Sequence, residues 1–426
     1  VPPQTKVIGT RWVFAVKSDG RFKARLVAQG YRDRFRLEIG DVSSPVCHGE
    51  SQKIVLAIAN NLGWHLEQLD FATAYLQAEM DREIFVKQPS GFEAMSKEIG
   101  KPYVWKLARS LYGLATSAKA WNQTVDQALK EMGWKATASD PCLYQRGQGE
   151  QYALLVLYVD DCLITSKTKE KLQQIKKELE CRFNIKHLGP ASTFVRLKIE
   201  RSEELGTLSI DQTKYVQETL ERFGMTDAKG VDTPMVREQQ QKKENEPLYT
   251  PQLKTYQEIV GSMLYLSTHT RFDISYSTWR LAKAMTCKLV TGYMVMLSGG
   301  AIAHGTKKQS ISAGSTTESE LIALDSCVKQ VLFIKGLLGK LGIQQNSPIS
   351  IFCDNAAACS IWETAKHGSR TKHLAVKLRR IADNVSNNHI KVAFFPGTLQ
   401  KSDCLMKVLS RMQHRRAIEL VCEGDT

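Results

Sequence analysis

The chain has 426 residues, of which 42% are hydrophobic, so its length and apolar content predict two or three domains with real cores. Lys and Arg exceed Asp and Glu by 58 to 44, giving a formal net charge of +14. This excess suits a polyanionic partner such as nucleic acid, and it equally suits a protein that is merely basic. No apolar run reaches the roughly 18 residues of a membrane span, so no membrane partner is expected.

The ten Cys residues are scattered and form no C-x-x-C pair. This pattern predicts reduced thiols and argues against a disulfide framework or a zinc site. The chain begins Val1-Pro2-Pro3, with neither an initiator Met nor a signal-peptide pattern. We therefore expect it to be a piece of a longer protein.

The first part of the chain mixes strand-type and helix-type patterns. In chain order these predict strands over 11–16 and 22–29, a helix over 51–61, strands from 66 and over 83–86, a helix over 118–132, two strands within 152–165 and an amphipathic helix over 169–183. A Gln-, Lys- and Glu-rich stretch over 238–247 is the best linker candidate. A second globular region from about Thr291 has a predicted strand, helix and strand, over 292–297, 316–341 and 348–352. The fold class expected is α+β.

Adjacent carboxylates interrupt the long apolar run over 152–165. The sequence Tyr158-Val159-Asp160-Asp161 has apolar residues on both sides, which predicts a β-hairpin with both acids near its tip. Neighbouring carboxylates repel, so ionising both favours a bound cation, and hard oxygen ligands suit Mg²⁺. Such acids can hold the metal ions of a phosphoryl-transfer site. A solvated acidic turn is the alternative for this tetrapeptide taken alone.

A third carboxylate, Asp70, lies at the end of an upstream predicted strand, in Gln68-Leu69-Asp70-Phe71-Ala72-Thr73-Ala74-Tyr75-Leu76. One acid there and two in the hairpin form the usual arrangement of a polymerase palm. Further motifs occur in a fixed order: Gly9-Thr10-Arg11-Trp12-Val13-Phe14, Lys23-Ala24-Arg25-Leu26-Val27-Ala28-Gln29-Gly30, Leu111-Tyr112-Gly113-Leu114, Ala120-Trp121 and Ser139-Asp140-Pro141. Together these motifs resemble the copia-type reverse transcriptases of LTR-retrotransposon Pol polyproteins, over nearly the whole chain.

The resemblance implies an RNA-directed DNA polymerase with a right-hand fold of fingers, palm and start of thumb over residues 1–237. A linker or connection over 238–290 and an incomplete α/β ribonuclease H-like domain over 291–426, without its first strand, would follow. Implied partners are template RNA or DNA, a primer, deoxynucleoside triphosphates and other polyprotein segments such as integrase and capsid. The implied location is a cytoplasmic virus-like particle, or the nucleus.

The family also implies roles for single residues. Asp70, Asp160 and Asp161 would hold two Mg²⁺ ions, with Mn²⁺ as an alternative. Lys23 and Arg25 would contact the triphosphate; without the motif, either would be an ordinary charge on a strand face. Tyr75 would pack under the deoxyribose and exclude a 2′ hydroxyl, the alternative being an ordinary core aromatic.

Some positions depart from the family pattern. Thr116 replaces a Gln that helps to seat the nucleotide, and Arg196 replaces a Gly near the primer terminus, where a bulky residue could strain the turn. Residues 34–41 also differ. These departures fit a decaying copy of the element, so a catalytically dead nucleic-acid-binding remnant is the rival interpretation, and a product without any biochemical role is a third.

The tail keeps three of the four carboxylates that ribonuclease H needs for its two metals. Glu320, Asp354 and Asp403 match the family pattern, and Arg370-Thr371-Lys372-His373 matches a further signature whose alternative is a basic surface turn. The first acid is missing, because a join near Thr286 to Lys288 omits the segment that carries it with the first strand. We therefore expect no ribonuclease H activity and a poorly supported tail fold.

Overall fold

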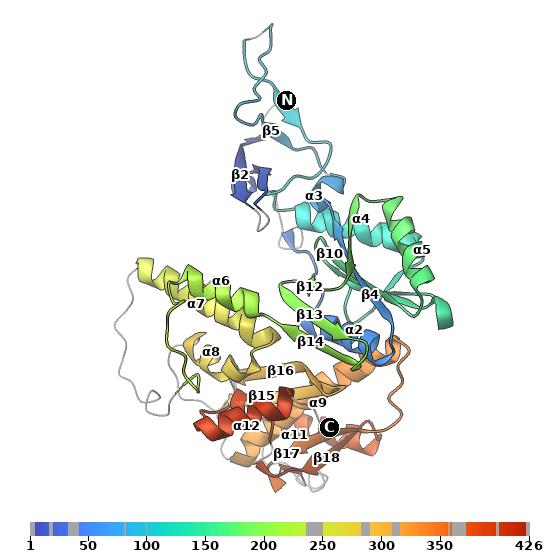
Figure 1. Ribbon diagram of the computed structural model, residues 1–426, viewed down its shortest axis with the longest axis vertical. Coiled ribbons are helices and arrows are strands. Elements are labelled where there is room, and N and C mark those ends of the chain that lie inside the picture. The colour runs from blue at the N-terminus through green and yellow to red at the C-terminus, as the bar shows by residue number, and fades with distance from the viewer. Residues whose placement is uncertain are drawn as a thin grey trace. The chain divides into compact units, whose positions relative to one another are not determined.

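The structure is a computed structural model, and it describes residues 5–16, 20–32, 42–80, 82–98, 100–235, 250–282, 290–308, 316–356, 358–359, 372–397 and 400–422. The chain forms two compact units, Val1–Val195 and Arg196–Thr426, drawn in blue to green and in green to red in Figure 1. Both units mix helices with strands, which confirms the predicted α+β class. None of the described helices has the length and apolarity needed to cross a membrane.

A six-stranded antiparallel sheet forms the centre of the first unit, in the order β11-β4-β10-β9-β8-β7. Its strands are β4 (His65–Phe71), β7 (Lys135–Ala136), β8 (Leu143–Arg146), β9 (Ala153–Tyr158), β10 (Asp161–Ser166) and β11 (Ile185–Pro190). Strands β9 and β10 form the predicted hairpin. Nearly all of their side chains are buried, on both faces of the sheet, because helices pack on it, and this explains the nearly unbroken apolar run.

Three helices pack around this sheet: α2 (Gly49–Asn61), α4 (Ser117–Glu131) and α5 (Lys169–Glu180). The buried face of helix α5 explains why the spacing of apolar residues in the sequence predicted a helix here. Leu172, Ile175 and Leu179 recur at helical spacing and are buried, and α5 contacts β4 and β10. At its start, the Thr168 side chain accepts a hydrogen bond from the backbone N–H of Lys171, which caps the helix.

Asp140, from the Ser-Asp-Pro motif, has a structural place in this unit. It is 0% exposed, and its carboxylate accepts hydrogen bonds from the backbone N–H of His48 at 2.9 Å and of Cys142 at 2.9 Å. The Cys47 thiol also donates to it, at 3.3 Å. Asp140 therefore ties the chain before α2 to the chain that enters β8.

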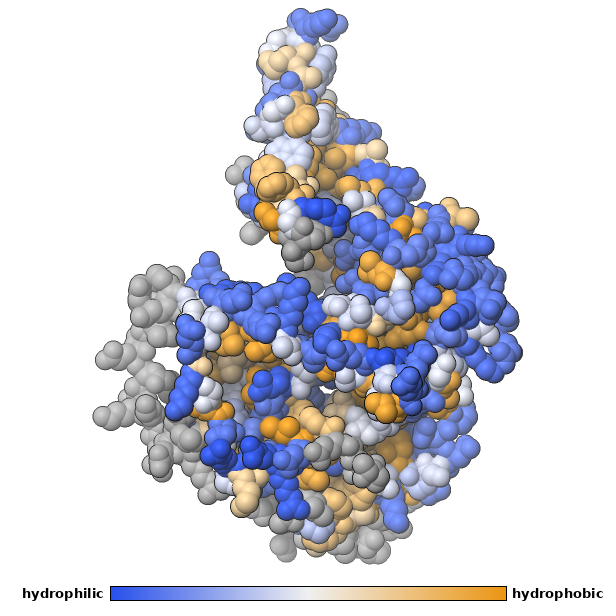
Figure 2. Space-filling view, in the orientation of Figure 1, coloured by the Kyte–Doolittle hydropathy of each residue, from blue (hydrophilic) through white to orange (hydrophobic). Residues whose placement is uncertain are grey.

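A two-stranded hairpin, β2 (Thr10–Val16) and β3 (Phe22–Ala28), carries the sequence predicted to form the fingers. Its outer residues are apolar and exposed, among them Phe14 and Phe22, and Figure 2 shows apolar side chains gathering over β2. The remaining strands of this unit are β1 (Val7–Ile8), β5 (Phe85–Lys87), β6 (Val104–Lys106) and β12 (Thr193–Phe194), and a short helix, α3 (Ala74–Gln77), follows β4.

Two glycines join the end of β3 to the Leu-Tyr-Gly-Leu motif. The backbone N–H of Ala28 donates to Tyr112 O at 2.7 Å, and that of Gly30 donates to Gly113 O at 3.2 Å. A Cβ at Gly113 would lie 2.2 Å from Ala28 O, and one at Gly30 would lie 2.2 Å from Gly113 O. The two motifs therefore need glycine because their backbones touch.

The second unit begins with the hairpin β13 (Leu197–Ser202) and β14 (Thr207–Asp211). Its other elements are α6 (Thr213–Arg222), α7 (Thr250–His269), α8 (Ser275–Ala282), β15 (Val290–Leu297), β16 (Gly300–Lys308), α9 (Thr316–Lys340), β17 (Ile349–Cys353), α11 (Lys372–Ser386), β18 (Ile390–Phe394) and α12 (Arg411–Cys422). Residues 250–282 of the predicted connection thus form helices. The predicted linker over 238–247 lies outside the described residues, so the domain boundaries after residues 237 and 290 stay predictions.

The region predicted to be ribonuclease H-like contains two separate pairs of strands in its described part. β15 and β16 pair antiparallel, β17 and β18 pair parallel, and α9 contacts both β15 and β17. Among the described residues no strand joins the two pairs. The predicted join near Thr286 to Lys288 and the signature residues Arg370 and Thr371 lie outside the described residues, so the missing first strand stays a prediction.

The turn before β13 has the strain expected from the departure at Arg196. Val195 has a φ of 48° and Arg196 a φ of 60°, both in the left-handed region that favours glycine. The Arg196 guanidinium lies 5.4 Å from the centre of the Tyr215 ring, a cation–π contact that offsets part of this cost. The sequence departure therefore coincides with a strained backbone position.

The close approach at Gly113 gives a stability prediction. Gly113→Ala should destabilise the protein by more than about 2 kcal/mol, because Ala meets both the left-handed φ of 89° and a backbone oxygen. Gly63→Ala is the matched control: its φ is 65° and no atom lies within 4 Å of the new Cβ, so only the cost of about 1 kcal/mol for φ remains. Urea unfolding measures both, and equal losses would contradict the steric argument.

Candidate active site

Strand register brings two of the predicted catalytic carboxylates together. Asp161, the first residue of β10, pairs with Asp70 on β4 and with Tyr158 on β9. Asp160 belongs to the turn that joins β9 to β10, next to Asp161. The three acids that the sequence separates by some 90 residues therefore meet at one end of the central strands.

The hairpin turn between β9 and β10 has only two residues, Val159 and Asp160, since Tyr158 pairs with Asp161. Two-residue loops favour the primed turns, which need a positive φ. Val159 has a φ of 59°, a conformation that costs a β-branched residue roughly 1–3 kcal/mol. The backbone N–H of Phe71 donates to Asp160 O at 2.8 Å, so the strand that carries Asp70 also holds this turn.

Burial and mutual repulsion shift the pKa values of the turn acids upward. Desolvation, with further increases from Asp160 and Asp70, raises the pKa of Asp161 to about 6. Desolvation also raises the pKa of Asp160, and Asp70 adds to this, whereas Arg25 and Lys23 oppose it. The site therefore concentrates negative charge that a cation would neutralise.

The predicted nucleotide-binding residues gather around Asp160. Lys23 and Arg25 occupy alternate positions of β3, hence one face of the hairpin, and both are close enough to lower the pKa of Asp160. The pKa of Tyr75 is raised by its burial and then by Asp160. The structure thus brings all three residues to the carboxylates, while their contacts with a nucleotide stay a prediction.

Tyr112 and Lys186 were not singled out from the sequence as site residues. The Tyr112 ring lies 5.0 Å from that of Tyr75, and the Arg25 guanidinium lies 5.6 Å from the Tyr112 ring. Lys186 pairs with Asp70 across β11 and β4, and its Nζ lies 3.3 Å from Asp70 Oδ2. The order of strands sets this second contact, and the sequence does not show that order.

Thr116, which replaces the Gln of the family pattern, is buried and lies immediately before α4. Its side chain makes no capping hydrogen bond, so the structure assigns it no role in starting the helix. The backbone C=O of Thr116 accepts a hydrogen bond from Ala120 N at 3.0 Å. Its effect on nucleotide seating stays a prediction.

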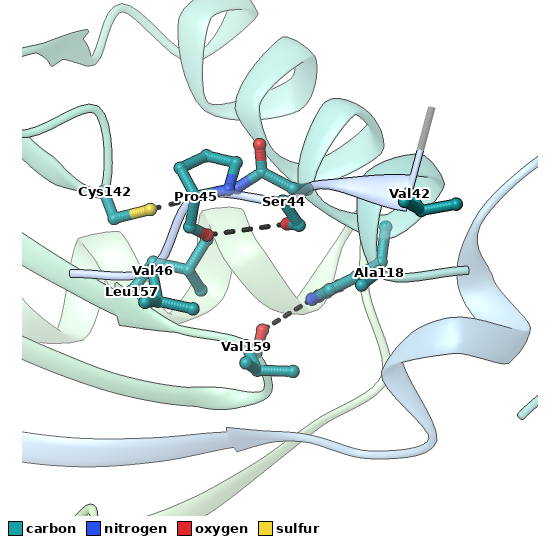
Figure 3. A pocket seen from close by; sticks show the side chains of 10 residues that line it. Val42, Ser44, Pro45, Val46, Ala118, Cys142, Leu157 and Val159 are labelled. Carbon is teal, nitrogen blue, oxygen red and sulfur yellow. Dashed lines mark hydrogen bonds between the residues drawn. The ribbon is translucent and has the colours of Figure 1, made fainter. Parts of the chain in front are cut away.

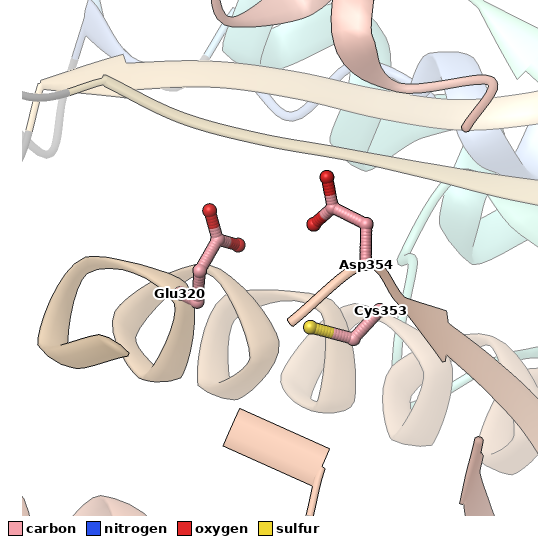
Figure 4. A group of neighbouring side chains, drawn as sticks. All are labelled: Glu320, Cys353 and Asp354. Atoms are coloured by element: carbon pink, nitrogen blue, oxygen red, sulfur yellow. The ribbon is translucent and has the colours of Figure 1, made fainter. Parts of the chain in front are cut away.

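The tail carboxylates meet in a separate cluster. Ligand atoms of Glu320, Cys353 and Asp354 all lie within 4.8 Å of one another, and Figure 4 shows Glu320 on its helix facing Asp354 at a strand end. Asp403 is near enough to raise the pKa of Glu320, after desolvation and Asp354. Its Oδ2 lies 2.8 Å from Lys407 Nζ, and its buried Oδ1 has no hydrogen-bond partner among the described residues. Cys353 was not singled out from the sequence.

Among the described residues, only the cluster of Glu320, Cys353 and Asp354 has three such ligand atoms within 4.8 Å of one another. The binding of metal ions by Asp70, Asp160 and Asp161 stays a prediction.

The raised pKa of Asp161 predicts a pH-dependent stability in metal-free protein. Between roughly pH 4 and pH 6 the folded chain holds a proton that the unfolded chain releases, so this acid makes stability fall as pH rises through that window. Asp161→Asn should therefore gain stability relative to the wild type from about pH 4 to pH 7. Urea unfolding in a chelator measures the difference. Asp227→Asn, at an exposed position, is the control, and a flat difference for Asp161→Asn would contradict the account.

Comparisons with known proteins identify the family of the chain. Residues 1–237 match the family described as reverse transcriptase (RNA-dependent DNA polymerase). The chain is 31% identical to the Retrovirus-related Pol polyprotein from transposon TNT 1-94 of Nicotiana tabacum, over 99% of this chain and 36% of that protein. It is 30% identical to the Retrovirus-related Pol polyprotein from transposon RE2 of Arabidopsis thaliana, over 96% of this chain and 32% of that protein.

The chain spans about a third of the length of these curated relatives. The alignment with the first of them extends over 480 residues, whereas this chain has 426, so the two proteins differ by insertions or deletions. A solved foamy viral protease-reverse transcriptase in complex with RNA/DNA hybrid is similar over 92% of this chain and 51% of its own, with 12% identity and a TM-score of 0.43, too low to establish a shared fold. On the family match and the curated relatives, the chain belongs to the reverse transcriptase family, in its copia-type Pol polyprotein branch.

Proposed function

We propose that this chain carries out RNA-directed DNA synthesis, adding deoxynucleotides to a primer. One observation supports this most strongly: Asp70 and Asp161 pair across β4 and β10, with Asp160 in the adjoining turn. Family membership supports the reaction class, and the convergence of the three acids supports their assignment as the catalytic residues.

The donor set fits divalent cations. Three carboxylates converge, and burial with mutual repulsion raises the pKa values of Asp160 and Asp161, a penalty that bound cations would relieve. Oxygen-only ligands favour Mg²⁺, with Mn²⁺ as a substitute. Two ions bound here would activate the attacking 3′ hydroxyl and stabilise the leaving pyrophosphate.

The surrounding side chains supply the binding functions. Lys23 and Arg25, on one face of β3, attract the triphosphate of the incoming nucleotide. Tyr75, whose ring packs against that of Tyr112, would exclude a 2′ hydroxyl from the incoming nucleotide. The net charge of +14 supports binding of a template and primer, which are polyanions.

The wider setting follows from the Pol polyprotein relatives. We propose that other segments of such a polyprotein, among them integrase and capsid, accompany this chain in a cytoplasmic particle or in the nucleus. This chain aligns with about a third of each relative, and we propose that such segments lie in the part of the polyprotein that does not align.

Primer extension tests the proposed activity. Asp160→Asn should lower DNA synthesis on an RNA template by at least about a hundredfold, because it removes a charged metal ligand, while template affinity stays within about twofold. Asp227→Asn, at an exposed position, should retain the wild-type rate. Synthesis by Asp160→Asn at a tenth of the wild-type rate or more would contradict the assignment. A wild-type chain that binds the hybrid in a salt-dependent manner and synthesises no DNA would support the rival interpretation as a binding remnant.

The tail cluster should not cleave the RNA strand of an RNA–DNA hybrid. Glu320 and Asp354 face each other, but Asp403 is paired with Lys407, and the described residues supply no fourth acid to bridge two ions. A labelled hybrid incubated with Mg²⁺ or Mn²⁺ measures this, with a known ribonuclease H as the positive control. Efficient cleavage that Asp354→Asn abolishes would show that another group has replaced the missing acid.

A further inference from the structure

The turn that presents Asp160 and Asp161 is held by a side chain to which neither the sequence nor the comparisons gave a role. The indole Nε1–H of Trp121, from α4, donates a hydrogen bond to Val159 O at 2.5 Å. Figure 3 shows this bond as the dashed line that ends at the carbonyl oxygen of Val159. We propose that Trp121 is a positioning residue of the polymerase site, acting through Val159 on the two turn carboxylates.

The turn needs such a support because its backbone is strained. Val159 has a φ of 59°, which its branched side chain disfavours. Strain of this kind persists only where surrounding groups hold it. Both carbonyl groups of the two-residue loop accept hydrogen bonds from outside the hairpin, Val159 O from Trp121 and Asp160 O from Phe71 N.

An aromatic cluster fixes the direction of the Trp121 N–H group. The rings of Trp121, Phe71 and Phe183 pack edge to face. The ring centroids are 5.2 Å apart for Phe71 and Trp121, 5.4 Å for Phe71 and Phe183, and 5.6 Å for Trp121 and Phe183. Phe71 directly follows Asp70 on β4, and Phe183 lies just before β11. The same cluster therefore connects the strand of Asp70, the turn of Asp160 and the start of α4.

A cavity of about 220 Å³ borders this contact, and Trp121, Val159, Leu157 and Ala118 contribute to its wall. The hydrogen bond from Trp121 is a specific contact that keeps Val159 O in place, and we expect its loss to let the peptide rotate.

Rotation of this peptide would move the carboxylates without disturbing the nucleotide-binding side chains. Lys23 and Arg25 lie on β3, and Tyr75 lies on α3, so none of them depends on the Val159 carbonyl. Removing the N–H group should therefore weaken metal binding and lower kcat, and leave the KM for deoxynucleotides within about twofold. A general loss of folding would instead lower the active fraction and leave the metal affinity of the folded protein unchanged.

The experiment replaces the Trp121 indole N–H with sulfur, using benzothienylalanine, which keeps the ring shape and removes the donor. Mn²⁺ affinity of the full chain is measured by electron paramagnetic resonance without nucleic acid, and kcat and KM by primer extension. Mn²⁺ affinity and kcat should each fall about threefold to tenfold, the range that one neutral hydrogen bond supports. The same replacement at Trp134, which is also buried but packs against Arg146, should change both by less than about twofold.

A second variant tests the route through the turn. Glycine adopts a positive φ without strain, so the Val159→Gly turn needs less support from Trp121. In the Val159→Gly background, the replacement at Trp121 should therefore change the logarithms of the Mn²⁺ affinity and of kcat by less than about half as much as in the wild type. Equal effects in both backgrounds, or an unchanged Mn²⁺ affinity, would overturn the inference. Only the measurement of kcat and KM rests on the proposed function. A wild-type chain that synthesises no DNA would overturn that function, and the measured Mn²⁺ affinity would still decide the role of Trp121.

Discussion

Repulsion among three carboxylates is the constraint on which the first unit depends. Asp70, Asp160 and Asp161 are partly buried. Burial raises the pKa values of Asp160 and Asp161, and the charge of Asp70 adds to both shifts, so the charged groups would lower their energy by moving apart. The fold prevents this by placing them on backbone that cannot shift easily. Asp70 and Asp161 sit in the ladders of central strands, and hydrogen bonds from Phe71 and Trp121 hold both carbonyls of the turn that contains Asp160.

The other features of this unit support that arrangement. The close approach of Gly30 and Gly113 attaches the β3 strand, with Lys23 and Arg25, beside the palm. Asp140 is buried and satisfied by backbone donors, so it fixes the start of α2 and of β8 at once. The motif residues therefore have two kinds of role. Some are acids of the site, and others, such as Gly30, Gly113 and Asp140, hold the backbone that supports the site.

Much of this could be predicted from the sequence because the signals are local. The apolar runs on both sides of Asp160 and Asp161 predicted the hairpin, and the periodicity of Leu172, Ile175 and Leu179 predicted α5. The contact of Lys186 with Asp70 could not be predicted, because it depends on β11 pairing with β4, over 100 residues away. The positive φ of Val159 could have been predicted from the sequence, because two-residue hairpin loops favour turns with a positive φ.

The second unit shows the limits of motif matching. Glu320 and Asp354 lie together as the family resemblance implied, but the same cluster includes the thiol of Cys353, and the two pairs of strands beneath α9 are separate in the described part of the chain. Arg196 shows how a single departure becomes a physical cost, because its φ of 60° is one that glycine adopts freely.

We propose that Asp70, Asp160 and Asp161 together hold the metal ions of a polymerase. The decisive measurement is anomalous diffraction from crystals of the full chain with Mn²⁺, an RNA–DNA primer–template and a non-hydrolysable nucleotide. We expect two Mn²⁺ peaks among these three carboxylates, about 3.5–4 Å apart. Peaks confined to Glu320 and Asp354, or no peak within coordination distance of Asp161, would contradict it.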